Sequence, residues 1–176
     1  MMGSGRAYQV AAAAALLPML DGDMTRQEFL ETMITEVTAH EIGHTLGLRH
    51  NFKASTWLDM EELANDEQTS LHGTSGSFMD YPAVNMAAPG EPQGEYFQSA
   101  VGPYDMWAIE YGYKEFGSNE DKHLEKIAAR SQDPGLDFGT DEDSFIGDPY
   151  TTVWDLGKDP IAFAESQLAL ADWGME

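Results

Sequence analysis

Three histidines between residues 40 and 50 have the spacing of a zinc site. His40 and His44 are four residues apart in a segment with helical character, so both imidazoles project from one face. Two nitrogens on one turn can take two corners of a tetrahedron around Zn²⁺, and His50 can supply a third. The fourth position is then open for water, as a catalytic zinc site requires. The spacing therefore predicts one zinc ion on His40, His44 and His50.

Glu41 directly follows the first histidine, and its position suits a base better than a metal ligand. Zinc lowers the pKa of a coordinated water towards about 7, and a nearby carboxylate can take that proton and pass it to a leaving amine. Gly47 can adopt the left-handed conformation that ends the helix and turns His50 towards the same metal. The pattern predicts peptide-bond hydrolysis with Glu41 as general base and then acid.

The segment from His40 to His50 resembles the zinc motif of the metzincin metallopeptidases. Ser77-Phe78-Met79-Asp80-Tyr81 resembles the methionine turn of the same clan, which we place at residues 77–82. In metzincins this methionine lies under the metal as an apolar floor, and in some families a tyrosine two residues later reaches the zinc or stabilises the oxyanion. The resemblance implies these two roles for Met79 and Tyr81.

Longer stretches of the chain resemble a family of large bacterial zinc-dependent metalloproteases. These stretches are His44 to Ser55, Ser77 to Tyr81, Gly102 to Tyr113 and Trp154 to Gly157. The helix expected over 103–112 also resembles the helix that follows the methionine turn in other metzincins, where an aspartate ties it to that turn. Asp105 is the counterpart of that aspartate. The resemblance further implies a peptide or protein substrate and a periplasmic or secreted location in a bacterium.

A helix over 25–46 is predicted to carry the first two histidines. Thr25 and Glu28 have the spacing of a capping box, apolar residues follow at helical intervals, and Gly47 ends the helix. Other helices are expected over 11–17, 57–64, 120–130 and 160–172. Thr151 to Trp154 is the best of few strand signals.

The length of 176 residues and a hydrophobic share of 42% predict one folded domain over 1–176, mainly α with long irregular loops. Metzincin catalytic domains usually place a twisted sheet before the active-site helix, and its edge strand holds the substrate. Only 39 residues precede His40, and they have helical character, so the sheet is expected to be reduced or absent. Two functions stay open: a zinc endopeptidase, or a zinc-binding fragment or module of a larger metalloprotease that is inactive alone.

The chain is strongly acidic, with 31 Asp and Glu against 9 Lys and Arg and a formal net charge of −22. This charge argues against binding to nucleic acid or an anionic membrane and favours cationic partners. The chain has no cysteine, so a metal must bind to His, Asp or Glu. No apolar run is long enough to span a membrane. The composition leaves the oligomeric state open.

Four further features of the sequence have weaker implications. The acidic segment 133–148 could bind Ca²⁺, but it lacks the spacing of a known calcium loop, so a solvated loop is favoured. Arg49 is expected to pair with a carboxylate near the site, while His72 and His123 are expected to be solvated. The apolar run from Val10 to Leu17 loosely resembles a signal peptide, yet an Ala-rich helix packed on the domain is favoured.

Overall fold

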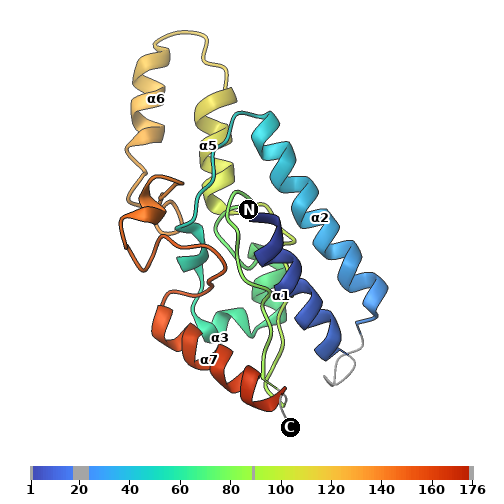
Figure 1. Ribbon diagram of the computed structural model, residues 1–176. Helices are drawn as coiled ribbons and strands as arrows, with labels where there is room; N and C mark the ends of the chain where they lie inside the picture. The colour runs from blue at the N-terminus through green and yellow to red at the C-terminus, as the bar shows by residue number, and fades with distance from the viewer. Residues whose placement is uncertain (1, 18–23, 89, 175–176) are drawn as a thin grey trace.

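The computed structural model describes residues 2–17, 24–88 and 90–174, and this part of the chain is mainly helical and contains no β-strand (Figure 1). The α-helices are α1 (Met2–Leu16), α2 (Arg26–Thr45), α3 (Met60–Leu63), α4 (Asp66–His72), α5 (Pro103–Tyr113), α6 (Glu120–Ala128) and α7 (Pro160–Trp173). Two 3₁₀-helices are η2 (Ala54–Trp57) and η3 (Asp143–Phe145). The prediction of a mainly helical chain is confirmed. Within the described ranges, no helix is long and apolar enough to cross a membrane.

One hydrophobic core joins the two ends of the chain. It is formed by Val10, Ala13, Leu17, Phe29, Val84, Met86, Tyr96, Phe97 and Leu170. The ring of Phe29 on α2 is fully buried and meets Tyr96 and Phe97 edge-on, at centroid distances of 5.5 and 4.8 Å. Such aromatic pairs stabilise a core beyond the area they bury. The Ala-rich helix α1 is therefore packed on the domain beside α2 (Figure 1).

A second, smaller hydrophobic core is formed by loop and helix residues that follow residue 56. It contains Leu58, Leu63, Ala83 and Leu156, with Trp57, Met60 and Phe163 packed against it. These residues come from η2, α3, α7 and the connecting loops, so the core holds loop segments in place without a sheet. At the other end of the molecule, α5 and α6 contact each other (Figure 1).

Helix α2 forms where the capping pattern places it. The Thr25 hydroxyl accepts a hydrogen bond from the Glu28 backbone, and the Glu28 carboxylate accepts one from the Thr25 backbone at 2.8 Å. This reciprocal capping satisfies two of the unpaired N–H groups at the helix start. The helix buries one face, formed by Phe29, Glu36, His40 and Gly43. Burial of that face sets the direction in which the first two histidines project.

Two expectations about secondary structure were wrong. Residues 151–154 form bends rather than a strand, and Trp154 has a φ of +67°, a left-handed conformation that a strand excludes. The helix expected over 57–64 is instead divided into η2 and α3, because Leu58 is extended and Asp59 caps a new helix through the Glu62 backbone.

Candidate metal centre

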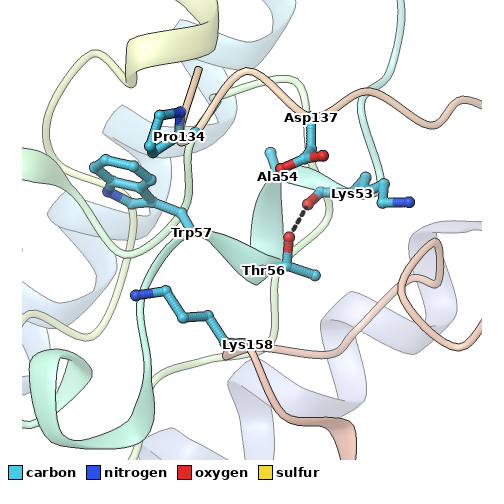
Figure 2. A pocket seen from close by; sticks show the side chains of 8 residues that line it. Lys53, Ala54, Thr56, Trp57, Pro134, Asp137 and Lys158 are labelled. Carbon is cyan, nitrogen blue, oxygen red and sulfur yellow. Dashed lines mark hydrogen bonds between the residues drawn. The ribbon is translucent and has the colours of Figure 1, made fainter. Parts of the chain in front are cut away.

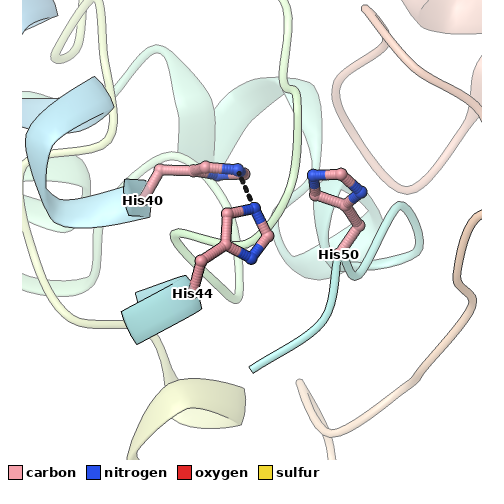
Figure 3. Close-up of side chains that lie close together, drawn as sticks. All are labelled: His40, His44 and His50. Carbon is pink, nitrogen blue, oxygen red and sulfur yellow. Dashed lines mark hydrogen bonds between the residues drawn. The ribbon is translucent and has the colours of Figure 1, made fainter. Parts of the chain in front are cut away.

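Three imidazole rings face a common space at the end of α2 (Figure 3). His40 and His44 project from the last turns of the helix, and His50 projects from the loop that follows. One ring nitrogen of each lies within 4.8 Å of those of the other two, and Nε2 of His40 is 3.1 Å from Nε2 of His44. No other group of three His, Asp or Glu side chains in the described chain is arranged to hold a metal ion.

The turn after α2 brings His50 back towards the helix. Gly47 has a φ of +86°, its N–H donates to the His44 carbonyl, and the Leu48 N–H donates to the Gly43 carbonyl at 3.1 Å. This pair of bonds is a Schellman motif, which ends a helix with a left-handed residue that is most often glycine. Gly47 thus occupies the conformation expected from the sequence, and the chain reverses within three residues of it.

Backbone carbonyls fix the rings of the two helical histidines. Nδ1 of His40 lies 2.6 Å from the Phe78 carbonyl, and Nδ1 of His44 lies 3.0 Å from the Leu48 carbonyl. A carbonyl oxygen only accepts, so each Nδ1 carries the proton and donates it. In the neutral rings each Nε2 then presents a lone pair to the shared space. Burial also lowers the pKa of His40, against the hydrogen bond to Phe78, so this ring favours its neutral form.

The ring of His50 is held by a carboxylate rather than a carbonyl. Its Nδ1 lies 3.0 and 3.1 Å from the two carboxylate oxygens of Asp141, which lies in the acidic segment. Its Nε2 lies 2.9 Å from the hydroxyl of Tyr81, which donates to that lone pair. Burial raises the pKa of Asp141, but the hydrogen bonds from His50 and the Thr140 hydroxyl oppose this rise, and the pKa lies below its ordinary value.

This donor set fits a zinc ion. The lone pairs of His40 and His44 face each other without a proton between them, an arrangement that a cation stabilises. Two nitrogens bound at 2.0–2.1 Å to a tetrahedral zinc lie about 3.3 Å apart, close to the 3.1 Å between these two atoms. Three neutral imidazoles are also a ligand set of known catalytic zinc sites.

A sequence model of the Met-zincin family matches residues 22–176 of the chain. The chain belongs to the Met-zincin family. This membership confirms the resemblance seen in the motifs, and with the three-histidine cluster it describes a metalloprotease-like domain. No curated protein and no solved structure matched the chain.

Met79 of this Met-zincin lies under the helix that carries the ligands. Its side chain is fully buried, and its sulfur lies so close to Gly43 that a Cβ on this glycine would collide with it. Gly43 lies between His40 and His44, on the buried face of α2. The sulfur therefore packs against the helix backbone at the ligand turn, where the sequence resemblance places the apolar floor.

Asp105 ties the methionine turn to α5. Its buried carboxylate accepts hydrogen bonds from the Ser77 hydroxyl at 2.5 Å, from the Phe78 N–H at 2.8 Å and from the Gly102 N–H at 3.2 Å. Burial raises the pKa of Asp105, and these three donors oppose the rise. Because the Phe78 carbonyl orients His40, the contacts of Asp105 extend to the first ligand.

Tyr81 lies between the histidines and a second aromatic ring. Its ring stacks on His40 at a centroid distance of 5.0 Å and on Trp154 at 5.3 Å. Burial raises the pKa of Tyr81, and the charges of Glu41 and Asp141 raise it further. The phenol is therefore protonated at neutral pH and can donate a hydrogen bond. The Glu41 side chain is exposed to solvent on the ligand turn.

Several carboxylates of the acidic segment 133–148 have partners within the protein. Glu142 pairs with Arg49 at 2.7 Å, which is the kind of partner expected for this arginine, and Asp148 lies 3.4 Å from the Lys53 ammonium. The Asp143 carboxylate accepts from the Thr140 backbone at the start of η3. The solvated loop favoured by the sequence, with calcium binding as its alternative, stays a prediction.

A pocket of about 300 Å³ has none of the three histidines in its lining, and Figure 2 shows the side chains that do line it. Its lining residues are Lys53, Ala54, Thr56, Trp57, Pro134, Gly135, Asp137 and Lys158. Both lysines that line the pocket have carboxylate partners. The ammonium of Lys158 pairs with Glu62 at 2.8 Å, and that of Lys53 pairs with Asp148 at 3.4 Å. None of the site residues predicted from the sequence lines this pocket.

The sequence analysis placed one group of residues at a common site: His40, His44, His50, Met79, Tyr81 and Asp105. It did not identify Asp141, Trp154 and Gly43, which contact members of this group in the structure. Asp141 was treated only as part of an acidic segment, and nothing in its neighbours distinguishes it from the other aspartates there. Trp154 was assigned to a strand. Gly43 carried a usable signal, because a glycine inside a strong helix pattern indicates close packing.

Proposed function

We propose that this chain is a zinc-dependent endopeptidase domain. The observation that carries the proposal is the set of three converging imidazoles, each with its Nδ1 proton directed away from the shared space. His40, His44 and His50 would hold the ion. A bound zinc ion supplies Lewis-acid chemistry, because it polarises a carbonyl and makes a water molecule more acidic.

Glu41 would act as general base and then as general acid. Its side chain is solvent-exposed on the helical turn between His40 and His44. Burial lowers the pKa of His40 and the Glu41 charge opposes this fall, while burial raises the pKa of Tyr81 and the Glu41 charge adds to this rise. Both effects support a position of the Glu41 charge near these two rings. Glu41 would take a proton from the attacking water and deliver it to the leaving amine. A positioned acid–base group contributes roughly 10²–10⁴-fold to such a rate.

Tyr81 would stabilise the negative charge that develops on the substrate carbonyl oxygen. Its hydroxyl already points into the shared space, where it donates to Nε2 of His50. With His50 holding a metal through Nε2, the Tyr81 hydroxyl would be free to donate to an oxyanion. The stacking of its ring on His40 and Trp154 limits where the hydroxyl can lie.

Metal analysis and a cleavage assay test the proposal together. Protein purified without chelator should contain one zinc per chain and should cleave an unstructured protein such as casein, and EDTA should abolish this cleavage. Glu41→Gln should keep the zinc and lose cleavage by at least about 10²-fold. The matched control is Glu31→Gln, an exposed glutamate elsewhere on α2, which should cleave like wild type. Absence of zinc, or full activity in Glu41→Gln, would refute the proposal.

A second candidate function is a zinc-binding module that does not cleave peptides by itself. The observation in its favour is the absence of any strand in the described residues, since an edge strand is the usual means of holding an extended substrate. The same assay separates the two functions. Zinc binding without chelator-sensitive cleavage would support the module. The periplasmic or secreted location stays a prediction from the resemblance.

A further inference from the structure

The third ligand is the only one of the three whose Nδ1 meets a charged group. His40 and His44 donate to backbone carbonyls, whereas His50 donates to the carboxylate of Asp141, with both oxygens within 3.1 Å. We propose that Asp141 is a positioning residue of the metal centre, which sets the orientation of His50 and its affinity for zinc. The proposal rests on the proposed zinc site and not on peptide cleavage.

His50 needs such a partner more than the other two ligands do. His40 and His44 project from a regular helix that fixes their backbones, while His50 lies in the loop after Gly47. A carboxylate that accepts the Nδ1 proton holds the ring in one rotation and one tautomer, and it increases the electron density that Nε2 offers to a metal. All three rings have an acceptor at Nδ1, but only His50 lacks a helical backbone, so its orientation depends more on that acceptor.

The loop that carries Asp141 is fixed to the ligand segment by the neighbouring residue. Asn51 is fully buried, its amide donates to the Asp137 carbonyl at 3.0 Å, and its amide oxygen accepts from the Gly139 N–H at 3.1 Å. The Phe52 N–H donates to the Gly139 carbonyl at 2.7 Å. These bonds bring the acidic loop against residues 50–52, so the position of Asp141 does not depend on its own contact with His50.

Two further contacts orient the Asp141 carboxylate. The Thr140 hydroxyl donates to its Oδ2 at 3.3 Å, and the Arg49 guanidinium lies 3.7 Å from the same oxygen. The guanidinium is bound more closely by Glu142, at 2.7 Å. Glu142 thus offers a neighbouring carboxylate that shares the arginine but does not touch the histidine, which makes it a suitable control.

Zinc affinity of two variants tests the role of Asp141. Competition with a chromophoric chelator should show zinc binding about 10–100-fold weaker in Asp141→Ala than in wild type. Asp141→Asn should lie between the two, because its amide oxygen can still accept the Nδ1 proton without the charge. Glu142→Gln should bind zinc like wild type. Thermal unfolding of the chelator-treated proteins should show that all variants are folded.

A spectroscopic measurement separates ring positioning from a general change of structure. With Co²⁺ in place of zinc, the proton NMR spectrum should contain one exchangeable, hyperfine-shifted Nδ1–H signal for each of the three histidines. Asp141→Ala should lose one of these signals through exchange with water, and Asp141→Asn should keep all three. Wild-type affinity in Asp141→Ala, or three retained signals in this variant, would overturn the inference. Neither readout requires peptidase activity, so a protein that binds zinc but does not cleave peptides would leave this test intact.

Discussion

Replacement of Asp105 by alanine should destabilise the protein more than a typical single substitution. The change removes the acceptor shared by three donors, the buried Ser77 hydroxyl and Gly102 N–H and the partly buried Phe78 N–H. A buried donor without a partner costs about 1–3 kcal/mol. Burial raises the pKa of Asp105, so the desolvation of its charge offsets part of the stability that these hydrogen bonds contribute. We therefore expect the free energy of unfolding to fall by about 2–4 kcal/mol.

Urea denaturation of chelator-treated protein measures this change without a contribution from bound metal. For a domain of this size, a loss of that magnitude lowers the urea midpoint by about 1–2 M. Asp172→Ala provides the control, since that exposed aspartate near the end of α7 should change stability by less than about 0.5 kcal/mol. If the midpoint of Asp105→Ala moved no further than that of the control, our account of how Asp105 holds the methionine turn would be refuted.

Three other predictions concern the turns and the buried acids. Gly47→Ala should lower stability by about 1–2 kcal/mol in urea denaturation, because alanine is strained at a φ of +86°. Gly43→Ala should weaken zinc binding in chelator competition, because the new Cβ collides with the Met79 sulfur, and wild-type affinity would contradict this packing. Burial raises the pKa values of Asp80 and Asp155 in the folded protein. The stability that each protonated carboxyl contributes is therefore complete below its pKa in the unfolded chain, and it is lost as the pH rises through its pKa in the folded protein. Acidification from pH 7 to 5 should therefore stabilise the chelator-treated wild type more than Asp80→Asn, and equal slopes of unfolding free energy against pH would contradict it.

Local features of the site could be predicted because their causes lie within a few residues. The capping box at Thr25, the left-handed Gly47 and the four-residue spacing of His40 and His44 all depend on backbone geometry over one or two turns. The family resemblance added Met79, Tyr81 and Asp105, which no local rule connects to the histidines.

The loops were harder to predict, since no periodic pattern governs them. Residues 151–154 contain β-branched and aromatic side chains, and by propensity alone they suggest a strand. In the structure, the ring of Trp154 instead stacks on Tyr81, and the Trp154 backbone N–H donates to the Tyr81 carbonyl. Trp154 makes these contacts with a left-handed backbone conformation. A tertiary contact of this kind overrides a preference that amounts to about 1 kcal/mol at most.

The sequence by itself determined the three-histidine cluster, the helix that presents His40 and His44 and the turn that returns His50. Only the tertiary structure decided which groups face the Nδ1 atoms of those ligands. Asp141 is separated from His50 by 91 positions, and the Phe78 carbonyl is separated from His40 by 38. The physical reason is that a hydrogen bond depends on distance and angle in space. Many aspartates in this acidic chain are equivalent in sequence, and it is folding that brings Asp141 against His50.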